Sequence, residues 1–425
     1  MEATRIRLAE GVHLTYLPAR KFKTSLLSAQ FVTPLRRETA GANALLAAVL
    51  RRGTVSCPDM GALSAKMDNL YDASIDYTVR KKGENQCVGF VASFIDDRYA
   101  PGGERLLEPA AALLGELICD PVTYHGRFVP EYFESEKTNL LEAIRSLIND
   151  KRDWADSRLL RALCDGEAYA VPRLGDEETV DKLQALKVYT QYRDLISTAP
   201  LEIIYSGSAD LERVKQALAA AFATLPREEV RVISTAAPHV CRESVQHVED
   251  VLDVTQGKLA MGFRTGGVTC WEEEYPAMAM CNAVFGGTTL SKLFMNVREK
   301  QSLCYYCAAR HDTPKNVMFV QSGVETKDLD RTEEAILKEL NDMKKGNITD
   351  DEILFAKLAM CNSYNAVADS AASMETWYLS GMLQGKLHTP EEYAERIMNI
   401  TKDEIVSAAE RVTLDTVYKL KGAAK

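Results

Sequence analysis

Residues 41–54 of this 425-residue chain read GANALLAAVLRRGT. Alanine and leucine are strong helix formers, and the closing glycine is a common stop signal, so the stretch predicts a helix from Gly41 to Arg52. Positions three and four apart lie on one face of a helix. Three positions with this spacing are Ala44, Ala47 and Ala48. An alanine methyl can neither bind a metal ion nor transfer a proton, so this face has no chemistry of its own.

The elements predicted around this helix follow the same order twice. Each half of the chain is predicted to contain a strand, two helices, two strands, several long helices and a final strand. This order recurs at a period near half the chain, which indicates duplication. In the first half, the predicted strands are Val12–Leu17, Ser25–Val32, Ser74–Val79, Gln86–Phe94 and Leu201–Gly207, and the further helices are Asp59–Leu70, Glu104–Cys119, Val129–Ile148, Trp154–Cys164 and Asp210–Leu225. In the second half, the strands are Lys258–Arg264, Leu303–Ala309, Val317–Val324 and Thr416–Leu420, and the helices are Glu272–Phe285, Ser291–Lys300, Arg331–Lys344, Asp350–Met382, Glu391–Met398 and Lys402–Val412.

Neighbouring strands joined by short turns, with helices grouped between them, predict an α+β fold rather than a Rossmann sheet. The segment between the two repeats carries two prolines and no periodicity, which is typical of a linker. We therefore predict two similar domains at residues 1–225 and 241–425, joined by a linker at 226–240. Each domain is expected to hold a mixed, mainly antiparallel sheet with helices packed on one face.

The composition argues against several classes of protein, namely nucleic-acid-binding, membrane and exported proteins. A net charge of −10, from 61 acidic and 51 basic residues, provides no basic surface and argues against nucleic acid as a partner. No apolar run approaches the roughly 20 residues of a membrane span, so no membrane association is expected. The N-terminal residues do not resemble a signal peptide, which predicts a cytoplasmic protein. The ten cysteines are scattered, mostly in apolar runs, and are interpreted as buried thiols.

Residues 41–54 resemble the zinc-binding helix of peptidase family M16, the pitrilysin and insulinase type. That helix reads H-x-x-E-H before an apolar turn and a Gly-Thr pair, with two histidine ligands and a glutamate base. The resemblance places the two ligands at Ala44 and Ala48 and the base at Ala47. It therefore implies that this helix has lost both its metal and its general base.

Residues 136–144, EKTNLLEAI, resemble the downstream helix that supplies the third zinc ligand of the family. The resemblance puts Ala143 at the ligand position. Glu142 lies one residue away, which is a rotation of about 100° on a helix and too far to substitute. The resemblance thus implies no metal or other cofactor in this chain.

Residues 291–305, SKLFMNVREKQSLCY, resemble a second motif of the family. In active members its arginine and tyrosine face the zinc and hold the substrate backbone, which implies this role for Arg298 and Tyr305. A cation and a phenol can donate hydrogen bonds to a carbonyl oxygen that gains negative charge. Ser302 stands where glycine is usual, so the turn there is expected to differ. Residues 169–175 and 204–207 resemble further family segments, and the resemblance covers nearly the whole chain.

Other interpretations of these residues remain open. An arginine near a helix C-terminus commonly stabilises the helix dipole, and a tyrosine on a strand commonly packs in a core. Cys304 and Cys307 have C-x-x-C spacing, but no second pair lies nearby and the segment is predicted to be a strand. No redox or metal role is therefore predicted for them.

The combination resembles the zinc-less subunit of bacterial M16 peptidases that divide their work between two chains. It implies a non-catalytic subunit of a heteromeric zinc metallopeptidase, which contributes Arg298, Tyr305 and half of a peptide-enclosing chamber. We expect a zinc-bearing M16 homologue as the partner, or a second copy of this chain in a homodimer, and a peptide as the substrate. The alternative is an inactive scaffold, or a peptide-binding protein, with no proteolytic role.

Overall fold

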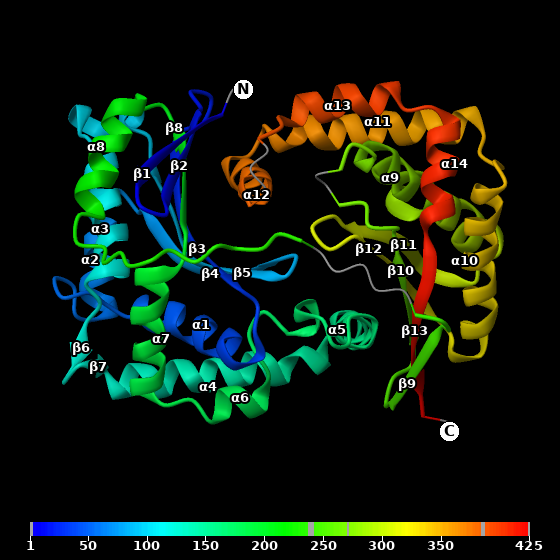
Figure 1. Ribbon diagram of the computed structural model, residues 1–425, viewed down its shortest axis with the longest axis horizontal. Coiled ribbons are helices and arrows are strands. Elements are labelled where there is room, and N and C mark those ends of the chain that lie inside the picture. The colour runs from blue at the N-terminus through cyan, green and yellow to red at the C-terminus, as the bar shows by residue number, and fades with distance from the viewer. Residues whose placement is uncertain (1–2, 237–241, 270–271, 384–386, 424–425) are drawn as a thin grey trace. The chain divides into compact units, whose positions relative to one another are not determined.

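The structure is a computed structural model that describes residues 3–236, 242–269, 272–383 and 387–423 (Figure 1). It contains two compact units, each built from separate segments of the chain. Unit 1 comprises Met1–Arg145, Val171–Ser234 and Ser370–Thr389, and unit 2 comprises Ser146–Ala170, Thr235–Asp369 and Pro390–Lys425. The change at residues 234–235 falls within the predicted linker, whose residues 237–240 lie outside the described part. The predicted domain boundaries stay a prediction.

Unit 1 is built on a six-stranded sheet in the order β1-β2-β8-β3-β5-β4. The strands are β1 (Thr4–Ala9), β2 (Val12–Pro18), β8 (Leu201–Gly207), β3 (Thr24–Pro34), β5 (Asn85–Ile95) and β4 (Ser74–Lys82). Strands β2 and β8 are parallel, and the other neighbours are antiparallel. The sheet is therefore mixed and mainly antiparallel, as predicted.

The two faces of this sheet carry different side chains. Leu27, Ala29 and Phe31 of β3 enter the main apolar core, together with residues of α1, α3 and α7. The helices of the unit are α1 (Arg37–Leu50), α2 (Met60–Asp68), α3 (Leu107–Cys119), α4 (Pro130–Ser146), α6 (Glu177–Asp181), α7 (Ala185–Thr198), α8 (Leu211–Ala221) and α12 (Ala371–Met382), with a hairpin of β6 (Thr123–Tyr124) and β7 (Arg127–Phe128). Alternate residues of a strand point to opposite faces, so Ser28 lies on the other face.

Helix α12 covers that other face, against β3 and β8. Its Glu375 is buried and accepts hydrogen bonds from the Ser28 hydroxyl at 2.7 Å and the Arg80 guanidinium at 2.6 Å. A buried carboxylate needs such partners to offset its lost hydration. A helix from late in the sequence thus completes a unit that is mostly made of early residues.

Unit 2 repeats the arrangement with a five-stranded sheet in the order β11-β12-β10-β13-β9. The strands are β11 (Cys304–Asp312), β12 (Val317–Val324), β10 (Gly257–Arg264), β13 (Thr413–Gly422) and β9 (Gln246–Leu252), with β13 and β9 parallel and the other neighbours antiparallel. The helices are α9 (Tyr275–Asn282), α10 (Leu329–Lys344), α11 (Asp350–Val367), α13 (Pro390–Asn399), α14 (Lys402–Arg411) and α5 (Lys151–Leu163), with the π-helical segments η5 (Ala283–Gly287) and η6 (Leu293–Lys300). The predicted α+β class, with two similar halves, is confirmed.

Helix α5 comes from the first half of the sequence but packs in unit 2. Its Ala155, Leu159 and Leu163 form a buried cluster with strand residues that include Phe319 and Tyr418. Just after this helix, Glu167, whose side chain is 5% exposed, accepts a 2.6 Å hydrogen bond from Arg264, and it also pairs with Lys315. Each unit therefore contains a helix from the other half of the sequence, with a buried carboxylate on that helix or just after it.

Two details of the sequence prediction are corrected. The single helix predicted at 350–382 is two helices, because Ser370 adopts an extended conformation and its hydroxyl caps α12 by accepting from the Ser373 amide. Strands β1 and β9 were not predicted. In the part of the chain that the structure describes, no helix is long and apolar enough to cross a membrane.

Candidate functional site

Three positions of the family's zinc motif lie inside the core of unit 1. Ala44, Ala47 and Ala48 are 2%, 0% and 6% exposed, on a helix that packs against α6, α7, β4 and β5. The neighbouring Asn43 fixes this helix by donating to the Gln86 side chain at 2.9 Å and accepting from Gln191 at 2.9 Å. These methyl groups do not fit a zinc ion, because they hold no lone pair.

The position of the third ligand is different. Ala143 lies on α4 and is exposed, as is the adjacent Glu142. About two turns earlier on α4, Glu136 forms an ion pair of 2.9 Å with Arg52, two residues after the end of α1. Among the described residues, no three His, Cys, Asp or Glu side chains are grouped so that they could hold a metal ion.

The predicted substrate-binding arginine lies on the π-helical segment η6. Its guanidinium stacks over the Phe294 ring at 4.6 Å, and its Nε lies 3.6 Å from a carboxylate oxygen of Glu299. The Arg298 side chain is 37% exposed. π-Helical turns are rare and are often found at functional sites, because the extra residue in each turn redirects a side chain. The sequence predicted a helix here but not this form.

A tight turn connects η6 to β11. Ser302 in this turn has φ of 52°, the left-handed conformation that glycine adopts most readily. The Leu303 amide donates to the Val297 carbonyl at 3.3 Å and closes the turn. A serine thus adopts the glycine-type backbone conformation at the position where the resemblance expects glycine.

The predicted tyrosine lies in a β-bulge at the start of β11. Cys304 pairs with Val324 and Tyr306 pairs with Gly323, so Tyr305 is the extra residue between them. Bulges often redirect a side chain beside an active site. Tyr305 is 60% exposed, and η6 packs against β11. Arg298 and Tyr305 therefore lie on two adjacent elements, on either side of one turn, and neither is buried in the core.

A hollow of about 630 Å³ in unit 2 is lined by Tyr306, the residue after Tyr305. Arg152 and Lys258 lie over the Tyr306 ring, at 5.0 and 5.5 Å from its centre. Burial raises the pKa of Tyr306 to about 12 and lowers the pKa of Lys258. Tyr306 therefore keeps its proton at neutral pH and can donate a hydrogen bond. Sequence analysis missed this hollow, because its residues come from three distant segments.

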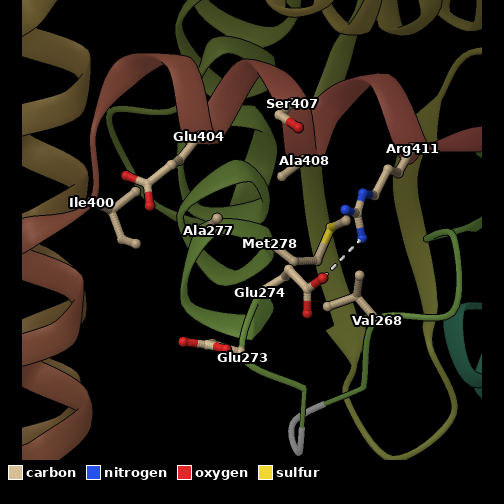
Figure 2. Close-up of a pocket in the computed structure, with 10 residues that line it drawn as sticks. All are labelled: Val268, Glu273, Glu274, Ala277, Met278, Ile400, Glu404, Ser407, Ala408 and Arg411. Atoms are coloured by element: carbon tan, nitrogen blue, oxygen red, sulfur yellow. Dashed lines mark ion pairs between the residues drawn. The ribbon is translucent and has the colours of Figure 1, made fainter.

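A second pocket, of about 380 Å³, lies between α9 and α14 (Figure 2). It is lined by apolar residues and by Glu273, Glu274, Glu404 and Arg411. Glu274 and Arg411 face each other at 3.7 Å, as the dashed line in Figure 2 shows. Glu404 accepts from the Thr401 amide and caps α14. These roles are structural, and the described residues that line the pocket form no arrangement of acid, base and nucleophile.

Comparison with known proteins agrees with this fold. The profile of the family described as "Peptidase M16 inactive domain" matches residues 182–360. A Bacillus subtilis protein named "Probable inactive metalloprotease YmfF" is 32% identical over 415 residues, covering 97% of this chain and 96% of the relative. This chain belongs to peptidase family M16. The family resemblance found in the sequence is confirmed.

Solved structures of similar proteins match this chain over its whole length. A conserved protein from Enterococcus faecalis V583 matches with a TM-score of 0.92 and 28% identity, covering all of both chains. A structure described as the peptidase M16 inactive domain from Pseudomonas fluorescens matches with a TM-score of 0.80 and 17% identity, covering 100% of this chain and 99% of that one. The second likeness shows the fold alone.

Proposed function

We propose that this M16 protein is the zinc-less subunit of a two-chain metallopeptidase and supplies Arg298 and Tyr305 to bind the peptide backbone. The observation that carries the proposal is the placement of both residues on irregular, partly exposed backbone at the turn between η6 and β11. A residue needed only for folding is more commonly found on regular, buried structure. The partner, a zinc-bearing M16 homologue, would provide the metal and the general base.

The hollow beside the bulge supports the same role. It places the cations of Arg152 and Lys258 over the ring of Tyr306, the residue that follows Tyr305 in the chain. Peptide carbonyl oxygens are hydrogen-bond acceptors, and such donors suit them. A chain that supplies donors but no metal can contribute to cleavage only when another chain supplies the rest.

The second candidate is an inactive M16 scaffold, or a protein that binds peptides without cutting them. It is favoured by the loss of all four functional side chains of the zinc motif and by the name of the B. subtilis relative. The two candidates make different predictions for the same variants, because a scaffold does not depend on Arg298 or Tyr305 for any reaction.

The test is reconstitution with a zinc-bearing M16 chain encoded by the same genome. We expect the two chains to co-elute in size-exclusion chromatography and to cleave peptides together, while this chain alone cleaves none. Tyr305→Phe and Arg298→Ala should each lower turnover by roughly 10²–10³-fold, the usual effect of losing one transition-state donor. Zinc content and co-elution should be unchanged.

Tyr99→Phe and Arg331→Ala are matched controls. Both residues are well exposed and lie outside the segment from η6 to β11, so these variants should cleave at the unaltered rate. Full activity of the Tyr305→Phe and Arg298→Ala complexes would refute the shared active site and leave the scaffold interpretation. Separate elution of the two chains would refute the partnership.

A further inference from the structure

The bulge at Tyr305 brings two cysteines to the same face of β11. In a regular strand, residues three apart point to opposite faces. Here the extra residue shifts the register, so that Cys304 pairs with Val324 and Cys307 pairs with Ser322. Val324 and Ser322 are two apart on β12 and share a face, and paired residues on neighbouring strands share a face as well. Cys304 and Cys307 are therefore neighbours on one side of the sheet.

The two thiols interact directly, and they have opposite character. A hydrogen bond from Cys307 lowers the pKa of Cys304 to about 7, despite the opposing effect of burial, and Ser322 and Arg298 act in the same direction. The same hydrogen bond and burial raise the pKa of Cys307 well above its ordinary value. Burial raises the pKa of Cys87 and of Cys281 to about 12. Cys304 is thus partly ionised to the thiolate at neutral pH, next to a protonated thiol.

Access and backbone freedom favour reaction at this pair. Cys304 is partly exposed, whereas Cys307 is buried. β11 is the edge strand of its sheet, so its backbone is held by hydrogen bonds on one side. A disulfide usually needs Cα atoms about 4.4–6.8 Å apart, and a bulged edge strand can adjust locally to reach that distance.

We propose that Cys304 and Cys307 are a redox site at which a hydroperoxide oxidises the dithiol to an intramolecular disulfide. The Cys304 thiolate attacks the O–O bond and becomes a sulfenic acid, and the released alkoxide or hydroxide takes up a proton. The Cys307 sulfur then attacks the sulfenic sulfur, forms the S–S bond and expels water. The dithiol loses two electrons and two protons, and the hydroperoxide is reduced to an alcohol, or water, and one further water.

This inference does not depend on the proposed peptidase role. Tyr305 lies inside the ring that the disulfide closes, so oxidation also moves the residue proposed to hold the substrate. The C-x-x-C spacing was visible in the sequence, but a regular strand would have separated the two thiols. The bulge, which the sequence did not predict, is what joins them.

The test treats the full-length chain with hydrogen peroxide, alkylates the remaining thiols and digests with trypsin. Cleavage after Lys300 and Arg310 yields the peptide 301–310, which contains both cysteines. We expect this peptide to escape alkylation, to be lighter than the reduced peptide by two hydrogens, and to return to the alkylated form after dithiothreitol. Cys307→Ser should stop at the sulfenic acid on Cys304, captured by dimedone, and Cys304→Ser should form no internal disulfide.

Cys361→Ser is the matched control, since Cys361 is a partly exposed cysteine of α11 with a raised pKa. This variant should oxidise at residues 301–310 as the unaltered chain does. The alkylation rate of Cys304 should also reach half its maximum near pH 7, and at a higher pH in Cys307→Ala, which removes the hydrogen-bond donor. Alkylation of both cysteines after peroxide treatment, or a disulfide from Cys304 to any other cysteine, would overturn the proposal.

Discussion

Replacing Glu167 with alanine tests how α5 is held in unit 2. The Glu167 carboxylate is the partner of two buried cations, Arg264 at 2.6 Å and Lys315. These two side chains are 1% and 0% exposed. Removing one partner of a buried ion pair typically costs about 3–5 kcal/mol, because a charge is left in the interior without compensation.

Arg264 retains two other contacts after the change. It donates to the Leu163 carbonyl at 2.6 Å and lies 3.3 Å from Asp415. We therefore expect a loss near the lower limit, about 3 kcal/mol. At about 1.4 kcal/mol for each factor of ten, this raises the population of opened unit 2 roughly a hundredfold.

Hydrogen exchange measured by mass spectrometry reports this loss of stability for individual segments of the chain. Amides of α5 that exchange only through opening should exchange roughly a hundredfold faster in Glu167→Ala. Glu249→Ala is the control, because Glu249 forms an exposed pair with Lys421 and its loss should change stability by less than about 1 kcal/mol. Exchange in α5 that stays within about threefold of the unaltered chain would refute the argument that the buried carboxylate holds this helix.

Two further predictions concern buried groups. Ala47→Glu should destabilise unit 1 by several kcal/mol, because it places an unpaired carboxylate in the core. Ala143→Glu, on the exposed face of α4, should leave the stability nearly unchanged. Equal urea midpoints for the two variants would contradict the burial of the zinc motif. Hydrogen bonds from Arg264 and Lys315 lower the pKa of Glu167, although burial opposes this, so its contribution is complete above the unfolded pKa of about 4.3 and is lost as pH falls through the lower folded value. The stability difference between the unaltered chain and Glu167→Ala should therefore shrink below about pH 4, and a difference that stays constant from pH 7 to pH 3 would contradict this linkage.

The fold was largely predictable from the sequence because apolar periodicity repeats along the two halves. That periodicity shows which side of a helix is buried, but it does not show against which sheet. The pattern at 350–382 therefore looked like one helix, although Ser370 starts a new one that packs in unit 1. Strands β1 and β9 were missed because none of their residues is buried, so they carry no run of apolar core positions.

The candidate site was predictable only through family resemblance. The motif pointed to Arg298 and Tyr305, but periodicity could not reveal that η6 is π-helical or that β11 begins with a bulge. The bulge depends on the register of β11 against β12, and the π-helical form depends on which backbone groups pair inside the helix, and apolar periodicity records neither. The same resemblance located the lost zinc motif, but only the structure shows that Ala44 and Ala47 are now core residues while Ala143 is exposed.

The exchange of helices has a consequence for how the protein is made. Unit 1 receives α12 from residues 371–382, so its sheet keeps one polar face uncovered until nearly nine-tenths of the chain has left the ribosome. Domains usually fold in order during synthesis, the first before the second. Here the first unit has to wait until most of the second, up to Asp369, has been synthesised. A nascent chain that stalls midway leaves Ser28 and Arg80 without Glu375, so its first half is not yet a complete unit.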